Sequence, residues 1–180
     1  MKSIAVFCGS KSGDNELYEM HARQLGQLMA KHGIQLVYGG GNKGLMGAVA
    51  NAVMYNGGSA IGVIPERLAE WDHHHKGLTE LVVVTDMHTR KRKMYELCDV
   101  AVILPGGYGT MDEMFEMLTW NQLAIHDKPI YILNTAGYYS DLFQMMQMMH
   151  LNGFLHEPLN KRVKIFEGPE ALIQYAVQQA

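Results

Sequence analysis

Short apolar segments alternate with longer segments of helical periodicity along most of the chain. Stretches such as "ELYEMHARQLGQLMAKHG" and "MDEMFEMLTWNQLAIH" carry apolar residues at helical spacing between the apolar runs. Runs that are apolar at consecutive positions indicate strands covered on both faces, and helical crossovers indicate parallel pairing. The pattern therefore predicts an α/β fold, a doubly wound sheet of about seven parallel strands, in a single domain over residues 1–180. The predicted strands are "SIAVFCG", "IQLVYGG", "SAIGVIP", "ELVVVTD", "VAVILPG", "PIYILN" and "VKIFEG".

Composition places the chain among ordinary soluble proteins. It has 180 residues, 48% of them hydrophobic and 18% charged, with a net charge of −3, so it lacks the basic excess expected of a nucleic-acid-binding protein. No apolar run approaches the roughly 18 residues of a membrane span, and the N-terminal apolar stretch is too short for a signal peptide. We therefore expect a cytoplasmic protein with neither a nucleic-acid nor a membrane partner. Cys8 and Cys98 form no CxxC or disulfide pattern and are expected to be buried small hydrophobes.

Glycine-rich turns follow three of the predicted strands: "CGSKSG", "YGGGNKGLMG" and "PGGYGT". Each offers free backbone amides just before a helix, an arrangement that suits one phosphate group. Glycine in any one of these turns is equally explained by a tight connection between strand and helix. Three such turns in one small domain favour a nucleotide site, with Ser10 in the first turn and Gly41 in the second as candidate contacts.

Two familiar nucleotide motifs are disfavoured. Gly39, Gly41 and Gly44 satisfy GxGxxG, but this motif follows the second predicted strand and no separate catalytic domain is present for a hydride acceptor. Gly44 is not followed by the Lys and Ser or Thr of a Walker A motif. NAD chemistry and NTP hydrolysis are therefore minor alternatives.

The segment "PGGYGTMDE" admits two interpretations. Thr110 and Glu113 have the spacing of a capping box, in which Thr110 would cap the helix and Glu113 would reach back to it. Asp112 and Glu116 suit the positive end of a helix dipole. Alternatively, Glu113 and Glu116 share a face that points back over the turn, so a phosphate bound there would bring its sugar near a carboxylate.

Basic residues follow the fourth predicted strand in "MHTRKRKMYE". Such a run is usually a solvated helix face, but cations at a helix N-terminus oppose its dipole and suggest an anion nearby. We expect the fourth and fifth strands to be adjacent, which would bring this segment and "PGGYGT" to one crevice.

A polar loop, residues 66–79, interrupts the alternation and is a candidate flap. It contains His73, His74 and His75. Adjacent histidines seldom converge on one ion, so a solvated loop is favoured and no metal site is expected. Farther along, Met145, Met148 and Met149 recur at helical spacing and are expected in the core or a subunit interface.

Three motifs together resemble one family. "PGGYGTMDE" fits PGGxGTxxE, and with Arg90-Lys91 and "GGGNKGLMGAVA" the chain resembles the LONELY GUY (LOG) phosphoribohydrolases from end to end. The resemblance implies a Rossmann-like homodimer that hydrolyses the N-glycosidic bond of a cytokinin riboside 5′-monophosphate, an N6-substituted AMP, to free base and ribose 5-phosphate. It implies no metal or redox cofactor. A less selective AMP or nucleoside monophosphate nucleosidase and a non-catalytic nucleotide or cofactor carrier stay open as alternatives.

The resemblance also implies site residues. Arg90 and Glu113 match the catalytic arginine and glutamate, and Asp72 stands where plant members have a glutamate. A carboxylate at Glu113 would stabilise positive charge on the ribose or activate water. The candidate substrate contacts are Ser10, Gly41, Asp72, Lys91, Gly106, Gly107, Tyr108, Gly109, Thr110, Met111, Asp112, Glu116 and Thr119.

Overall fold

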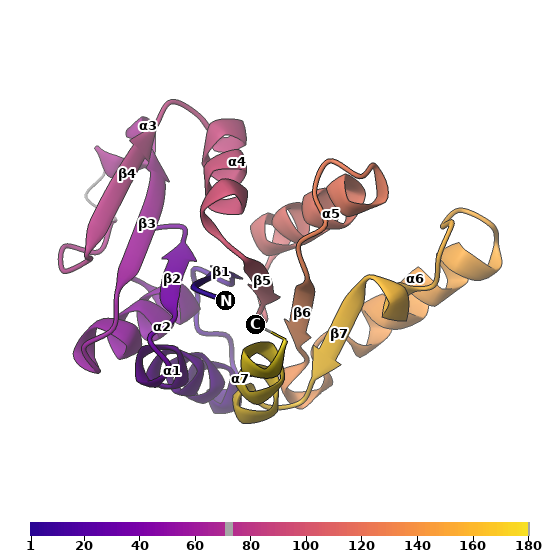
Figure 1. Ribbon diagram of the computed structural model, residues 1–180, viewed down its shortest axis with the longest axis horizontal. Helices are drawn as coiled ribbons and strands as arrows, with labels where there is room; N and C mark the ends of the chain where they lie inside the picture. The colour runs from indigo at the N-terminus through magenta and orange to yellow at the C-terminus, as the bar shows by residue number, and fades with distance from the viewer. Residues whose placement is uncertain (71–73, 180) are drawn as a thin grey trace.

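The computed structural model describes residues 1–70 and 74–179, which build one parallel seven-stranded sheet with helices on both faces (Figure 1). All the predicted strands are confirmed. In chain order they are β1 (Ser3–Phe7), β2 (Gln35–Tyr38), β3 (Ala60–Pro65), β4 (Glu80–Val84), β5 (Val100–Ile103), β6 (Ile130–Leu133) and β7 (Val163–Phe166).

The helices alternate with the strands, as the periodicity predicts. They are α1 (Glu16–Lys31), α2 (Gly44–Tyr55), α3 (Glu66–Ala69), α4 (Met87–Leu97), α5 (Tyr108–Gln122), α6 (Ser140–Leu151) and α7 (Pro169–Gln178), with short 3-10 turns η1 (Thr135–Gly137) and η2 (Leu159–Lys161). In the view of Figure 1, α1, α2 and α7 gather below the sheet and α4 and α5 above it.

Side chains of the central strand β1 pack against the helices on both faces of the sheet. Ile4 and Val6 belong to the apolar cluster under α1, α2 and α7, whereas Ala5 and Phe7 belong to the cluster under α4 and α5. Successive side chains of a strand point to opposite faces, so a strand buried on both sides must be apolar at every position. The unbroken apolar run is explained by this two-sided burial.

The sheet order is β4-β3-β2-β1-β5-β6-β7, so the expected adjacency of β4 and β5 is wrong. The first four strands are added outward from β1 in one direction, which leaves the other edge of β1 for β5. Helix α4 must therefore cross back over the sheet between the edge strand β4 and the central β5. The winding direction reverses between β1 and β5, which is where ligands bind in doubly wound sheets.

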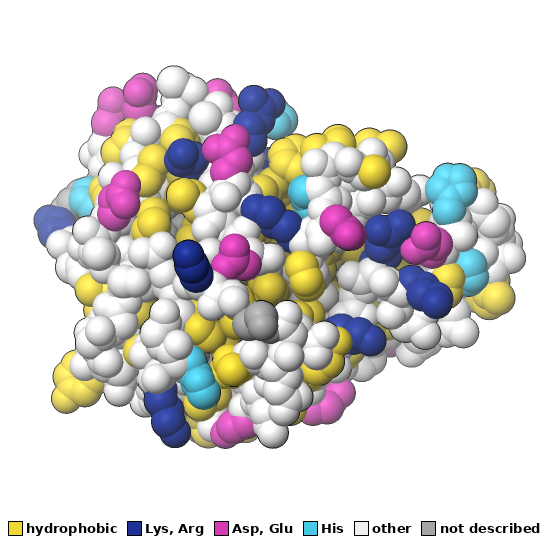
Figure 2. Space-filling view, viewed as in Figure 1, with side chains coloured by type: hydrophobic (Ala, Val, Ile, Leu, Met, Phe, Trp, Pro, Cys, Tyr) yellow, Lys and Arg dark blue, Asp and Glu magenta, His cyan; other side chains and the backbone are white. Residues whose placement is uncertain are grey.

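The visible surface is mixed in charge. Figure 2 shows acidic and basic side chains interspersed over that face, without a broad basic area. Among the described residues, none of the helices combines the length and apolar character needed to cross a bilayer.

Candidate active site

The three glycine turns meet at the carboxyl edge of the central strands. The Gly9 amide donates to the Pro105 carbonyl at 3.0 Å, and the Leu45 amide donates to the Gly9 carbonyl at 3.1 Å. Gly44 has a φ of +58°, and a Cβ there would lie 2.4 Å from the Lys11 amide nitrogen. These contacts lock the first, second and fifth turns into one assembly, as a shared site requires.

Helix α5 begins at Tyr108 with its N-terminal amides free. Gly107 is the N-cap, no side chain caps the helix, and the first intrahelical bond runs from the Met111 amide to the Gly107 carbonyl at 3.1 Å. Helix geometry therefore leaves the amides of Tyr108, Gly109 and Thr110 without intrahelical acceptors. Such amides at the positive end of a helix dipole favour an anion such as a phosphate.

The capping-box prediction is wrong. Thr110 lies inside the first turn of α5, two residues after the helix begins, because the chain enters the helix through Gly106 and Gly107. A Cβ at Gly106 would lie 2.1 Å from Thr110 Oγ1, so the turn closes tightly over this buried threonine. Glu113 does not reach back to a cap; its carboxylate accepts a hydrogen bond from Arg90 of the neighbouring helix α4.

Arg90 and Glu113 form a buried ion pair between α4 and α5. Arg90 Nη1 donates to Glu113 Oε1 at 2.9 Å, and only 10% and 9% of the two side chains are exposed. Arg90 Nε donates to the carbonyl of Val63, which lies within β3, at 3.0 Å. The guanidinium is thus held by β3 on one side and by the carboxylate on the other.

Burial and the nearby Arg90 act in opposite directions on the pKa of Glu113. Burial raises its pKa above the ordinary value of 4.5, and the charge and hydrogen bond of Arg90 oppose that rise. Tyr95 Oη donates to the Glu113 carbonyl at 3.0 Å and fixes the helix backbone at this point. Cys8 lies close by, and burial, followed by the Glu113 charge, raises the pKa of its thiol well above the ordinary range. Cys8 therefore lines the pocket as a neutral thiol and does not act as a nucleophile.

Lys91 belongs to a separate ionic cluster. Lys91 Nζ donates to Asp112 Oδ2 at 2.9 Å and also pairs with Glu116. Burial opposes its charge, yet the two carboxylates outweigh that effect and raise the Lys91 pKa. The basic run therefore divides: Arg90 and Lys91 are buried and paired with α5, whereas Arg92 is exposed, as expected of a solvated face.

A pocket of about 400 Å³ opens beside the ion pair and the start of α5. It brings together seven of the predicted site residues, and a neighbouring pocket of about 260 Å³ shares Ser10 and Gly107 and adds Gly106. Gly39, Met46 and Met94 also line the larger pocket; the sequence offered only the glycine motif and the helical periodicity as signals for them. The predicted residues that line it are Ser10, Arg90, Gly107, Tyr108, Gly109, Thr110 and Glu113.

Other predicted contacts lie elsewhere. Lys91, Asp112 and Glu116 form the cluster outside the pocket lining, and Met111 packs against the apolar core beneath α4 and α5. Gly41 is not among the residues that line the pocket, but a Cβ placed on it would lie 3.0 Å from Cε of Met46, which does line it. Asp72 and His73 lie outside the described residues.

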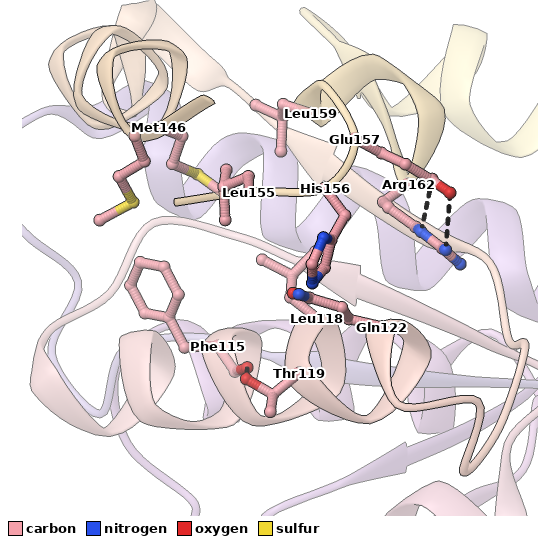
Figure 3. A pocket seen from close by; sticks show the side chains of 11 residues that line it. Phe115, Leu118, Thr119, Gln122, Met146, Leu155, His156, Glu157, Leu159 and Arg162 are labelled. Carbon is pink, nitrogen blue, oxygen red and sulfur yellow. Dashed lines mark hydrogen bonds and ion pairs between the residues drawn. The ribbon is translucent and has the colours of Figure 1, made fainter. Parts of the chain in front are cut away.

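Thr119 faces a different, apolar pocket on the other side of α5. This pocket, of about 390 Å³, lies between α5, α6 and the segment after α6. Figure 3 shows Phe115 and Thr119 of α5 on one side of it and Met146 and Leu155 on the other, with the Arg162–Glu157 ion pair at the rim. It offers neither a helix start nor the Arg90–Glu113 pair. The predicted catalytic pair and the start of α5 therefore belong to the pocket beside Glu113.

The described part of the predicted flap folds over the second glycine turn. Residue His74 pairs with Gly41 in an isolated antiparallel bridge, and the His75 amide donates to the Gly40 carbonyl at 2.9 Å. His75 Nε2 lies 3.0 Å from Asn51 Oδ1. Within residues 1–70 and 74–179, no group of three or more His, Cys, Asp or Glu side chains is arranged to hold a metal ion.

The chain is similar to several known proteins over most of its length. The profile of a protein family described as "Possible lysine decarboxylase" matches residues 46–176. A cytokinin riboside 5′-monophosphate phosphoribohydrolase of Rhodococcoides fascians is 43% identical over 175 residues, which cover 96% of this chain and 87% of the relative. An Arabidopsis thaliana protein of the same description is 43% identical over 170 residues, covering 94% and 77%. Among solved structures, a molybdenum cofactor binding protein from Rippkaea orientalis has a TM-score of 0.75 at 25% identity, covering 98% and 96%.

Proposed function

The chain belongs to the LONELY GUY (LOG) family, described as possible lysine decarboxylases, and on this premise we propose that it is a cytokinin riboside 5′-monophosphate phosphoribohydrolase. It hydrolyses the N-glycosidic bond of an N6-substituted AMP and releases the free base and ribose 5-phosphate. The observation that carries the proposal is the buried Arg90–Glu113 pair, which borders the same pocket as the free amides of α5.

Binding of the 5′-phosphate orients the nucleotide in the pocket. The 5′-phosphate occupies the start of α5, where the amides of Tyr108, Gly109 and Thr110 and the helix dipole complement its charge. Glu113 lies one turn further along the same helix, so the ribose attached to that phosphate extends toward its carboxylate. Fixing the phosphate on one rigid helix start converts binding energy into alignment of the scissile bond.

Glu113 acts on the ribose as an ionised carboxylate. As the bond between C1′ and the base nitrogen breaks, its electron pair leaves with the base and positive charge develops on the ribose. Water adds to C1′, and its proton is passed on so that the free base leaves neutral. The carboxylate either stabilises the ribosyl cation or takes the proton of the water, and both roles require Glu113 to be ionised.

Arg90 binds Glu113 and has one donor left for the substrate. Nη1 is engaged with Glu113 and Nε with the Val63 carbonyl, while Nη2 makes no hydrogen bond within the described residues. Arg90 lines the pocket, and this remaining donor is the one available to the nucleotide or the departing base. Arg90 therefore favours the ionised form of Glu113, against the effect of burial, and offers a donor to the substrate.

The family's description as a lysine decarboxylase finds no support in the pocket. A Schiff-base lysine needs a lowered pKa so that its amine is neutral. Lys91, which neighbours Arg90, has a raised pKa and is held between two carboxylates. We propose that the hydrolase needs no metal or organic cofactor, because the phosphate, carboxylate and guanidinium contacts supply the chemistry of glycosidic cleavage.

Two alternatives use the same pocket. A broader AMP nucleosidase would use the same groups but tolerate an unsubstituted N6, and a carrier is suggested by the likeness to the molybdenum cofactor binding protein. Incubation with AMP and with isopentenyl-AMP, followed by chromatography for the free base, separates them. The proposal predicts faster release from isopentenyl-AMP; equal release favours the broader nucleosidase, and binding of both without release favours the carrier.

We also propose that two copies of the chain assemble into a homodimer. The support is an exposed apolar surface on and just after α6. Met145, Met148, Leu151 and Phe154 are 54%, 53%, 70% and 80% exposed, respectively. Side chains of this size are more often covered by a partner than left to solvent when they cluster on one element.

A further inference from the structure

Gly39 lies directly against the guanidinium of Arg90. It follows β2, and a Cβ placed on it would come within 2.0 Å of Arg90 Nη2 and 3.1 Å of Arg90 Cζ. The nearest other atom is Met46 Sδ at 3.2 Å, in a flexible side chain that can move aside. The space that a side chain at position 39 would need is therefore filled by the arginine.

The backbone does not require glycine at this position. Gly39 is absent from the residues with positive φ, whereas its neighbour Gly40 has a φ of +76°. An alanine at position 39 would therefore adopt the backbone without strain. Steric room for Arg90, rather than conformational freedom, is the reason for glycine.

Arg90 is held on its other sides by fixed acceptors. Nε is bonded to the Val63 carbonyl and Nη1 to Glu113 Oε1, so the planar fork has little freedom to tilt. Nη2, the donor nearest Gly39, is the one left for substrate. We propose that Gly39 is a positioning residue for hydrolysis: its missing side chain lets Arg90 hold Glu113 and present Nη2 to the nucleotide at the same time. The inference rests on the proposed function for its catalytic consequence, and on geometry alone for the coupling of Gly39 to Arg90.

The size of the perturbation follows from the distances. Real Cβ atoms essentially never come within 3.0 Å of such a neighbour. In Gly39→Ala the distance of 2.0 Å between the new Cβ and Arg90 Nη2 must therefore grow by about 1 Å, and we expect Nη2, at the end of its side chain, to move. A misplacement of about 1 Å at a catalytic group typically costs about 10²-fold in rate. The loss should fall mainly on kcat, because the phosphate contacts at the start of α5 are untouched.

The test is a double-mutant cycle with Gly39→Ala, Arg90→Ala and the combined variant. Gly39→Ala should lower kcat on isopentenyl-AMP by about 10²-fold with at most a few-fold change in KM. Added to Arg90→Ala, it should have no further effect on kcat, on AMP affinity by calorimetry or on the melting temperature, because the methyl group then has room. Gly168→Ala is the matched control: Gly168 has a φ of −146°, and its Cβ would meet only Glu170 Oε2 at 3.6 Å. This control should keep wild-type kcat.

Three results would overturn the inference. They are wild-type kcat in Gly39→Ala, a loss of equal size in the presence and absence of Arg90, or a loss confined to KM. If Gly39→Ala alone fails to fold, recovery of folding in the combined variant supports the steric coupling, and failure of both refutes it. If the wild-type chain releases no base, the proposed function fails, but the melting temperature still decides the coupling, because Gly39→Ala should lower it only when Arg90 is present.

Discussion

Replacing Arg90 by alanine should destabilise the protein in a pH-dependent way. The substitution removes a guanidinium that is 10% exposed and leaves the buried Glu113 carboxylate without its partner. Breaking a buried ion pair from one side costs about 3–5 kcal/mol, because an uncompensated charge remains in the interior. For a domain of this size, that loss lowers the melting temperature by on the order of 10 °C.

The pH dependence follows from the pKa of Glu113. Burial already raises this pKa above 4.5, and Arg90 opposes the rise, so the variant's folded-state pKa lies higher still. Between the unfolded pKa and that raised value, the folded state holds a proton that the unfolded state has lost. Stability therefore falls as pH rises through this window, by about 1.4 kcal/mol per pH unit, and is constant above it.

The assay is urea unfolding of wild type and Arg90→Ala at pH 5 and at pH 8. The difference in unfolding free energy between the two proteins should be small at pH 5 and reach the full loss at pH 8. Arg90→Ala combined with Glu113→Gln should recover part of the loss at pH 8, because the orphaned charge is removed. A difference of the same size at both pH values would show that Glu113 is not the buried charge that Arg90 compensates.

Further predictions concern binding, pH, thiol reactivity and assembly. AMP should bind at least about tenfold more tightly than adenosine in calorimetry, since the phosphate occupies the start of α5; equal affinities would rule out that phosphate site. The acid limb of kcat/KM should lie above the ordinary Glu value of 4.5, because burial raises the Glu113 pKa; a limb below pH 4 would exclude Glu113 as the ionising group. Cys8 should resist iodoacetamide at pH 8 in the folded protein, since burial raises its pKa; mass spectrometry showing rapid alkylation would contradict this burial. Light scattering at micromolar concentration should give twice the 20.2 kDa chain mass, and a monomer mass would refute the dimer.

The sheet could be predicted because its determinants are local. Each strand is apolar at consecutive positions and the longer crossovers have helical periodicity, so the strands and these helices were identifiable from their own residues. The short helix α3 lies within residues 66–79, which the sequence predicted as a loop. The strand order is not local information. The expected neighbour of β4 was β5, but β5 pairs with β1, as Ile4 and Val100 show. No residue within β4 or β5 encodes which free edge the chain will use.

The local part of the site could also be predicted, whereas the contact between two helices could not. The glycine turn and the carboxylate of Glu113 are a few residues apart, so their proximity follows from helix geometry. The partnership of Arg90 with Glu113 depends on how α4 crosses the sheet, and spacing alone favoured a capping box instead. Thr119 is predicted as a substrate contact because it matches a family position. It is six residues beyond Glu113, about 240° around the helix, and it lines the apolar pocket instead.

The central claim is that the Glu113 carboxylate performs glycosidic hydrolysis, and the Glu113→Gln variant tests it most directly. Glutamine keeps a side-chain oxygen that Arg90 Nη1 can still reach, but it carries no charge. Release of free base from isopentenyl-AMP should fall by about 10²-fold or more, while AMP affinity, measured by calorimetry on the same folded sample, stays within a few-fold of wild type. Near-normal release of free base by this variant would contradict the account and leave Glu113 as a structural partner of Arg90.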